Sequence, residues 1–188
     1  MSGPRRGEDG HARCPWALST PDYVTYHDDE WGRPLHTDDE MFERLTLEGF
    51  QSGLSWLVIL RKRPGFRAAF AEFSLSAVAG FGGDDVARLM TDSGIVRNRA
   101  KIEATIGNAR AAMTLPGGLL GFVSGFAPSR QRRAPRTLAE VRSTSPESLA
   151  MSKALKRHGL RFVGPTTAYS LMQATGLVND HLAGCWVR

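Results

Sequence analysis

Both cysteines of the chain stand near histidines at spacings that are typical of a metal site. Twelve residues separate Cys14 from His27, and His181 and Cys185 occupy positions i and i+4. The second spacing places two ligands on one helical face or across a final helical turn. Two thiolates and two imidazoles suit Zn²⁺ in a closed tetrahedral site, which would join the N-terminal segment to the C-terminal segment. The spacing alone leaves open two buried thiols with unrelated histidines.

Glu48 is the acid best placed to recognise a planar ligand. It stands beside Gly49 at the end of an amphipathic pattern, in a part of the chain that holds three of the four tryptophans and two of the three tyrosines. Aromatic faces with a carboxylate at their edge are how a pocket recognises a nucleobase turned out of a duplex. Alternatively, Glu48 is an exposed helix-end residue and the aromatic side chains fill the core. The aromatic residues are Trp16, Tyr23, Tyr26, Trp31 and Trp56.

Residues 159–166 have the pattern of a tight turn between two helices. Gly164 precedes Pro165 and opens the second helix. Free backbone N–H groups at the positive end of such a helix suit a phosphate oxygen. The alternative is an ordinary helical hairpin with Phe162 and Val163 in the core.

The helices that must position these groups are marked by their ends and by apolar spacing. Thr37 and Glu40 form a capping box that opens a helix with Met41, Phe42 and Leu45 on one face. Runs of β-branched residues with period two are nearly absent, so the predicted class is all-α. Other helices are predicted over residues 84–91, 97–113 and 166–175.

A further helix is predicted from Ser145 at its N-cap with Pro146 directly behind it. Its leucines Leu149 and Leu155 are expected to face inward. The preceding stretch, residues 116–145, is rich in Gly and Pro and is expected to be a long surface connection. Its arginines, which either face nucleic acid or are simply solvated, are Arg130, Arg132, Arg133 and Arg136.

Length and composition exclude several classes of protein. The chain has 188 residues, of which 41% are hydrophobic and 23% charged, enough to bury a core without an external staple. No apolar run approaches the ~20 residues of a membrane span, and no hydrophobic segment follows the first basic residues, as a secretory signal requires. Membrane insertion and secretion are therefore excluded, and a cytoplasmic protein is expected.

The net charge indicates the kind of partner, and the start of the chain sets the limits of the folded domain. A formal net charge of +5 favours an anionic partner, with nucleic acid first. Residues 1–12 are rich in Gly and charge and are expected to be a disordered tail. Residues 13–188 are expected to form a single α-helical domain.

Together these motifs resemble the 3-methyladenine DNA glycosylase I (Tag) family. They follow the family's order and spacing from about residue 12 to the end, which is more than nine-tenths of the chain. The motifs are Cys14-Pro-Trp16, Tyr23-Val-Thr-Tyr26-His27-Asp-Asp-Glu-Trp31-Gly32, Leu47-Glu48-Gly49, Gly53-Leu54-Ser55-Trp56, Gly94-Ile-Val-Arg97-Asn-Arg-Ala-Lys101-Ile, Ser152-Lys-Ala-Leu-Lys156, Phe162-Val-Gly164 and Leu177-Val-Asn179-Asp-His181.

The resemblance implies a helix-hairpin-helix DNA glycosylase fold, with a structural zinc and a base-specific pocket. Glu48 would hydrogen-bond the methylated adenine, with Trp16, Tyr26 and Trp56 around the base and Tyr23 and Trp31 near the same pocket. The implied zinc ligands are Cys14, His27, His181 and Cys185.

The same resemblance implies how double-stranded alkylated DNA is held. The hairpin with Gly164 and Thr166 would grip the DNA backbone. Leu54, beside Gly53, would fill the gap left by the flipped nucleotide, as apolar wedges do in other proteins. Phe50 departs from the family pattern, because a more polar residue is expected there, and its bulk would shift packing at the pocket edge.

The implied reaction is hydrolytic excision of 3-methyladenine by a monomeric, monofunctional enzyme that leaves an abasic site. N3-methylation gives adenine a positive charge, so the base leaves easily, and an aromatic face binds such a cation with about 0.5–2 kcal/mol. The family is understood to work without the aspartate that related glycosylases place beside the sugar. Asp180 is therefore left out of the catalytic set, although its position keeps it a candidate.

Two rival functions remain at this stage. A zinc-stabilised DNA-binding module would not need Glu48 among aromatic residues. A glycosylase with another alkylpurine preference would keep every motif named above.

Overall fold

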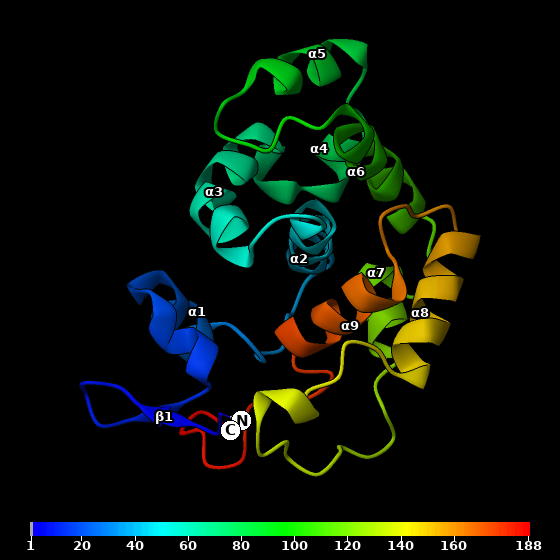
Figure 1. Cartoon of the computed structure of the whole chain (residues 1–188). Helices are drawn as coiled ribbons and strands as arrows, with labels where there is room; N and C mark the ends of the chain where they lie inside the picture. Colours follow the sequence, from blue (N-terminus) through cyan, green and yellow to red (C-terminus); the bar gives the residue numbers. More distant parts are fainter. Residues whose placement is uncertain (1) are drawn as a thin grey trace.

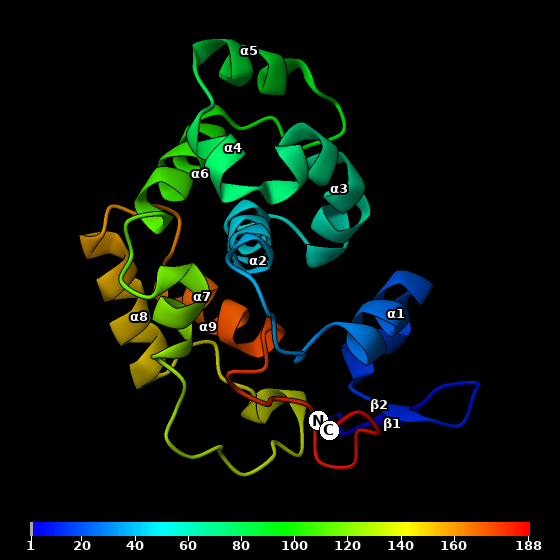
Figure 2. The same ribbon diagram turned by 180° about the vertical axis from the view of Figure 1, so that it is seen from behind.

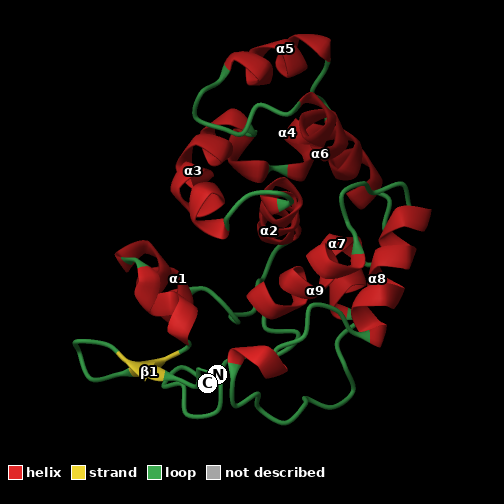
Figure 3. Cartoon of the chain, viewed as in Figure 1, coloured by secondary structure: helices red, strands yellow, loops and turns green. Residues whose placement is uncertain are grey.

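The structure, a computed structural model, describes residues 2–188 and consists mainly of helices, with one long connection over residues 125–145 (Figures 1 and 3). None of the helices in this part of the chain has the length and apolar character that crossing a bilayer requires. Three short 3₁₀ helices cover Pro15–Ser19, Ala71–Phe73 and Leu138–Glu140. The regular elements are β1 (Arg5–Arg6), β2 (Ala12–Arg13), α1 (Pro21–Asp29), α2 (Asp38–Gln51), α3 (Trp56–Ala69), α4 (Leu75–Ala79), α5 (Gly83–Thr91), α6 (Arg99–Ala112), α7 (Gly118–Ser124), α8 (Pro146–Arg157) and α9 (Pro165–Ala174).

Helix α2 lies at the centre of the molecule, with α3, α4 and α6 on one side and α7 and α9 on the other (Figures 1 and 2). Its predicted capping box is confirmed: the Glu40 amide donates to Thr37 Oγ1 at 3.2 Å, and the Glu40 carboxylate accepts from the Thr37 amide at 3.1 Å. Met41, Phe42 and Leu45 are buried as predicted.

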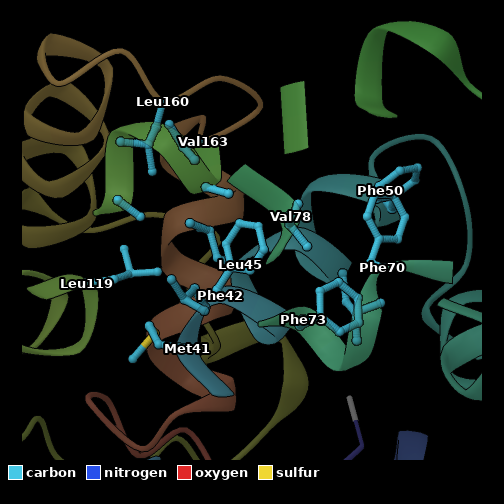
Figure 4. Close-up of a cluster of buried hydrophobic side chains, with 14 of the residues drawn as sticks. Met41, Phe42, Leu45, Phe50, Phe70, Phe73, Val78, Leu119, Leu160 and Val163 are labelled. Carbon is cyan, nitrogen blue, oxygen red and sulfur yellow. The ribbon is translucent and has the colours of Figure 1, made fainter. Parts of the chain in front are cut away.

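One continuous apolar core surrounds α2 (Figure 4). Towards α3 it is aromatic, with ring centroids 6.1 Å apart for Phe42 and Phe73 and 5.8 Å apart for Phe70 and Phe73. On the opposite side, Leu119 of α7 and Val163 of the α8–α9 connection complete the cluster. Because buried apolar area is the main source of stability, this core fixes α2 relative to all the helices that pack on it.

The helices predicted from apolar spacing are confirmed to within two residues at their ends. The predicted ranges 84–91, 97–113 and 166–175 correspond to α5, α6 and α9. Helix α8 begins as predicted, with Pro146 as its first residue and the Ser148 amide donating to Ser145 Oγ at 3.2 Å. It ends before Gly159, whose φ of 88° is favourable for glycine alone.

The prediction that Leu149 faces inward is wrong, since this side chain is 54% exposed, whereas Leu155 is buried. The inward face of α8 instead contains two serines, Ser148 and Ser152, which are buried because they bond to backbone atoms. Ser152 Oγ donates to the Val163 carbonyl at 2.7 Å and so ties α8 to the connection that follows it. Ser148 and Ser152 are thus buried on the face of α8 where apolar residues were expected, and Leu149 is not.

Two segments without a clear pattern are more regular than expected. Residues 116–145 contain α7, whose Leu119 and Val123 are buried at i and i+4, and the Leu120 amide donates to Asp38 Oδ1 at 2.8 Å. Residues 5–13, expected to lie mostly in a disordered tail, form the antiparallel pair β1–β2. Arg13 supports this pair through an ion pair of 2.6 Å with Asp9.

The two chain ends lie side by side (Figures 1 and 2). The Trp186 amide donates to the Ala12 carbonyl at 2.8 Å. A second, small apolar cluster of Cys14, Leu182 and Cys185 lies at this junction. The fold therefore closes on itself at the place where the predicted metal ligands meet.

Two helical glycines provide a test of the packing. Gly65 of α3 lies against Gly94, and a Cβ at residue 65 would be 2.5 Å from the Gly94 carbonyl oxygen, whereas the nearest atom to a Cβ at Gly107 of α6 is an Arg161 nitrogen at 3.8 Å. Gly65→Ala is expected to lower the free energy of unfolding by about 1–3 kcal/mol. Gly107→Ala, the matched control, is expected to raise it by about 0.5–1 kcal/mol. Urea unfolding measures both, and equal effects of the two variants would contradict the close α3–Gly94 contact.

Candidate active site and metal centre

A cavity of about 580 Å³ opens between α1, α2, the start of α3 and α9. The 3₁₀ helix Pro15–Ser19 and residues 138–141 complete its wall. Glu48 and all five aromatic residues singled out in the sequence line it, namely Trp16, Tyr23, Tyr26, Trp31 and Trp56. The structure therefore gathers the whole predicted base-binding set around one space.

The aromatic rings around this cavity pack against one another. Tyr26 and Trp56 have ring centroids 5.4 Å apart at 47°. Trp16 meets Tyr23 and Trp31 edge to face at 5.6 and 5.1 Å, an arrangement that the ring quadrupoles favour. Trp56 Nε1 is buried without a hydrogen-bond partner in residues 2–188. Rigid, largely apolar walls of this kind are typical of a site for a planar ligand.

Glu48 is a buried titratable group in the wall of the cavity. Its side chain comes from α2, and the residue is only 6% exposed. Burial raises the pKa of this carboxyl from 4.5 to about 7, against the opposing influence of Arg44. Within residues 2–188 no hydrogen bond reaches the carboxylate, so its oxygens remain free for a ligand. A buried acid with a strongly shifted pKa in a cleft is typical of a functional site.

A polar network behind the cavity holds Tyr26. Arg44 Nη1 donates to the Tyr26 hydroxyl at 2.8 Å, and Arg44 also pairs with Glu30 at 3.5 Å. Glu30 is in turn paired with Arg63 of α3. Burial raises the pKa of Tyr26 far above its usual value, so the hydroxyl stays protonated at neutral pH. Since the oxygen accepts from Arg44, its proton is available to another acceptor.

One wall of the cavity is made of residues that no sequence motif predicted. Ser170 and Gln173 line it from α9, spaced i and i+3, and Leu138 and Val141 line it from the stretch expected to be a plain surface connection. The i, i+3 spacing of these two polar residues places them on one face of α9, but the two threonines of the same helix leave this signal weak. The two apolar residues were not identifiable, because their place depends on how a long connection folds back.

Asp180, a candidate in the sequence, lies in the same wall. Its Oδ2 accepts hydrogen bonds from the Tyr169 hydroxyl at 2.7 Å and from Gln173 Nε2 at 2.9 Å. The residue is 5% exposed. These bonds hold the carboxyl group at the cavity edge.

Phe50 does not line the cavity, contrary to the shift in pocket-edge packing expected for it. It is buried in the core, where its ring centroid lies 4.7 Å from that of Phe66. The change from a polar residue is therefore absorbed by the apolar core.

The predicted metal ligands form one buried cluster of Cys14, His27, His181 and Cys185, whose donor atoms all lie within 4.8 Å of one another. Cys185 Sγ lies 3.4 Å from His27 Nε2 and 3.6 Å from His181 Nδ1, and Cys14 Sγ lies 4.0 Å from His181 Nδ1. The pKa of Cys185 is lowered, first by the hydrogen bond with Cys14 and then by the two histidines. This four-residue cluster can hold a metal ion.

Both histidines are oriented by partners on their other ring nitrogen. His27 Nδ1 lies 2.7 Å from Asp28 Oδ1, and His181 Nε2 lies 3.2 Å from the Trp31 carbonyl. Such partners fix the ring orientation and the tautomer that presents a lone pair to a metal. The Leu182 amide also donates to Cys14 Sγ at 3.4 Å, as amides do to a thiolate.

The elements predicted to contact DNA lie outside the cavity. Gly53, with φ of 85°, and Leu54, 38% exposed, form the turn between α2 and α3. Gly164 is the N-cap of α9, and Thr166 is exposed in the first turn. The first intrahelical bond of α9 is donated by the Ala168 amide. Earlier amides of this turn thus have no acceptor within the helix.

Fold and site together define a class of protein. A helical hairpin with an open helix N-terminus lies beside an exposed turn, and next to both is an aromatic cavity lined by two buried acids, Glu48 and Asp180. This combination is that of a helical enzyme or binding protein that takes up a single base from a nucleic acid.

Comparison with known proteins identifies the family. The model of the methyladenine glycosylase family matches residues 16–188. The chain is 46% identical to DNA-3-methyladenine glycosylase 1 of Escherichia coli (strain K12), over 92% of this chain and 95% of that protein. It is 40% identical to DNA-3-methyladenine glycosylase of Haemophilus influenzae (strain ATCC 51907 / DSM 11121 / KW20 / Rd), over 92% and 96%. The chain therefore belongs to the methyladenine glycosylase family.

A solved structure supports the same assignment at the level of the fold. A variant of 3-methyladenine DNA glycosylase I in complex with 3-methyladenine superposes with a TM-score of 0.88 at 31% identity, covering 93% of this chain and 96% of that one. The family resemblance found in the sequence motifs, and with it the helical glycosylase fold, is confirmed.

The raised pKa of Glu48 predicts a pH-dependent stability. Because the folded-state pKa lies above the unfolded value, the stability that Glu48 contributes is complete below pH 4.5 and is lost as the pH rises through about 7. Glu48→Gln removes this loss. The variant is therefore expected to match the wild type near pH 4.5 and to exceed it at pH 8 by at most about 3 kcal/mol. Urea unfolding of both proteins between pH 4.5 and 8 measures the difference, and a difference that does not grow with pH would contradict the raised pKa.

Proposed function

We propose that this protein is a monofunctional DNA glycosylase that takes 3-methyladenine out of alkylated double-stranded DNA, hydrolyses its N-glycosidic bond and leaves an abasic site. The observation that carries the proposal is the Glu48 carboxyl, which is buried at the edge of an aromatic cavity and has no hydrogen-bond partner among residues 2–188. The names of the relatives, which are those of 3-methyladenine DNA glycosylases, agree with it.

Recognition of the base rests on its charge. N3-methylation makes adenine a cation, and Glu48 in its anionic form would accept a hydrogen bond from the base and neutralise that charge. With a pKa of about 7, the carboxyl is poised between its two forms in the free protein, and a cation beside it favours ionisation. The faces of Tyr26 and Trp56 add attraction of the cation–π type. Neutral adenine gains neither the attraction to the Glu48 carboxylate nor the cation–π attraction.

The excision step needs little further help from the protein. The bond between the sugar and the base breaks, and its electron pair leaves with the base, which becomes neutral. The sugar is left as an oxocarbenium-like cation that water attacks, and one proton is released. Asp180 is held at the edge of the same cavity by Tyr169 and Gln173, and it remains outside the proposed catalytic set.

The four-residue cluster suits Zn²⁺ as a structural ion. With Zn–S near 2.3 Å and Zn–N near 2.0–2.1 Å, tetrahedral coordination places sulfur and nitrogen atoms about 3.6 Å apart. Two separations in the cluster, 3.4 and 3.6 Å, agree with this value, and the third, 4.0 Å between Cys14 Sγ and His181 Nδ1, is longer. All four positions are taken by protein ligands, so the bound ion would stabilise the junction of the chain ends rather than activate water.

DNA would be held by two exposed elements while the base occupies the cavity. The backbone amides around Gly164 and Thr166 would bind phosphate oxygens at the start of α9. Leu54, on the turn opened by Gly53, would occupy the gap that the flipped nucleotide leaves in the duplex. Since one chain carries the cavity and both elements, a monomer suffices.

Base release tests the reaction. Zinc-loaded wild-type protein is expected to release free 3-methyladenine from methylated DNA, and Glu48→Gln at least tenfold less, because the amide cannot neutralise the cation. The wild-type kcat/KM is expected to rise with pH through about 7, as the carboxylate forms. Chromatography of the released bases measures both effects.

Glu43→Gln is the matched control, since Glu43 lies on the same helix but pairs with Arg67 outside the cavity. It is expected to keep wild-type activity. No release of any base by the wild type, with tight DNA binding retained, would replace the proposal with a binding module. Release of another alkylpurine in preference would change the substrate.

Metal analysis tests the zinc site. The purified protein is expected to contain about one Zn²⁺ per chain, and Cys185→Ser is expected to lose the metal and to unfold at a clearly lower temperature, because metal binding contributes directly to folding. His36→Ala, at an exposed histidine outside the cluster, is the control and is expected to keep both. A metal-free wild type with unchanged thermal stability after chelation would contradict the site.

A further inference from the structure

Lys101 is a buried lysine to which the proposed reaction assigns no role. It lies in the first turn of α6 and is 8% exposed. Its Nζ donates to the Phe50 carbonyl at 2.9 Å and to the Ser52 carbonyl at 2.8 Å. A buried ammonium is costly unless it is well bonded. Here its partners are carbonyls at the C-terminus of α2, where the helix dipole also favours a cation.

The carbonyls held by Lys101 flank the start of the turn that carries Leu54. Ser52 has φ −48° and ψ 114° and Gly53 has φ 85°, which are the angles of a type II turn. The Leu54 amide closes this turn on the Gln51 carbonyl at 2.7 Å. Lys101 therefore holds the turn from the buried side, while the Leu54 side chain is exposed to solvent.

The same helix also holds the hairpin between α8 and α9. Asn108 lies seven residues after Lys101, on the same face of α6. Its side chain donates to the Arg161 carbonyl at 2.9 Å and accepts from the Arg161 amide at 2.7 Å. In addition, Lys101 Nζ lies 6.0 Å from the centre of the Phe162 ring. The hairpin lies next to α6 in Figures 1 and 2.

These contacts make α6 a spacer between two exposed elements. Seven residues of α-helix span about 10 Å, and the helix is held by the core on its other face, through Ile102 and Ile106. The turn 51–54 and the hairpin 159–164 therefore have a set separation before any DNA is bound.

We infer that Lys101 is a positioning residue for base flipping. It holds the turn 51–54 at a fixed distance from the hairpin 159–164, so that Leu54 enters the duplex when the hairpin binds the DNA backbone. The inference rests on the proposed function, since it assigns Leu54 to the gap in the duplex. Lys101 itself touches neither the base nor the cavity, and it acts through Leu54.

A double-mutant cycle tests this inference. Lys101→Met keeps most of the side-chain length and removes the donor. It is expected to lower the single-turnover rate of 3-methyladenine release from DNA at least tenfold. Combined with Leu54→Ala, it is expected to cost less than about twofold further, because a residue that acts through Leu54 has little to position once that side chain is gone.

Two readouts separate positioning from a general loss of structure. The affinity of Lys101→Met for free 3-methyladenine, measured by tryptophan fluorescence, is expected to stay within about twofold of the wild type, and its affinity for unmodified DNA within about threefold. Lys101→Arg is expected to recover most of the rate. Lys62→Met is the matched control, since Lys62 Nζ also bonds a carbonyl, that of Ser93 at 2.7 Å, away from the turn. It is expected to excise at the wild-type rate.

The outcomes that overturn the inference differ from failure of the proposed function. An unchanged rate in Lys101→Met, an additive loss in the double variant, or a parallel loss of free-base affinity would each overturn it. If Lys101→Met does not fold, Lys101→Gln, whose shorter side chain does not reach both carbonyls, replaces it in the same cycle. Failure of the wild type to release any base would contradict the glycosylase assignment itself.

Discussion

The burial of α2 on every side is the constraint on which the rest of the molecule depends. This helix carries Glu48 into the cavity, and a carboxyl group taken out of water prefers to be neutral. An exposed or loosely packed helix would shift to solvate the group. Here Met41, Phe42 and Leu45 anchor α2 in a continuous core, so the acid stays buried. The raised pKa of Glu48 is thus a property of the packing as much as of the residue.

The four-residue cluster and the cavity share their supporting elements. Helix α1 presents Tyr26 to the cavity and the next residue, His27, to the cluster. Trp31 lines the cavity with its ring, while its carbonyl orients His181. When the four residues of the cluster come together, α1 and Trp31 are therefore also positioned as one wall of the cavity. A structural ion at the chain ends would thereby affect base recognition without touching the base.

On the opposite side of α2, helix α6 plays a similar part for the exposed elements. It bonds the α2–α3 turn through Lys101 and the α8–α9 hairpin through Asn108. Both sets of bonds end on backbone atoms, so they set main-chain positions and leave the side chains of the turn and hairpin free. Helices α2 and α6, with the core between them, thus fix the relative positions of the cavity, the turn and the hairpin.

Local sequence signals determined the helices, since caps such as Thr37 and Ser145 and apolar repeats act within a few residues. The four-residue cluster of cysteines and histidines and the aromatic set around Glu48 were also identifiable, because rare residue types at characteristic spacings are conspicuous. Tertiary structure alone decided that Leu149 is exposed while Ser148 and Ser152 are buried, and that Leu138 and Val141 close the cavity. It also decided that Lys101 bonds carbonyls some fifty residues away. These features depend on which surfaces meet across long sequence separations, and no short-range pattern in the chain records such meetings.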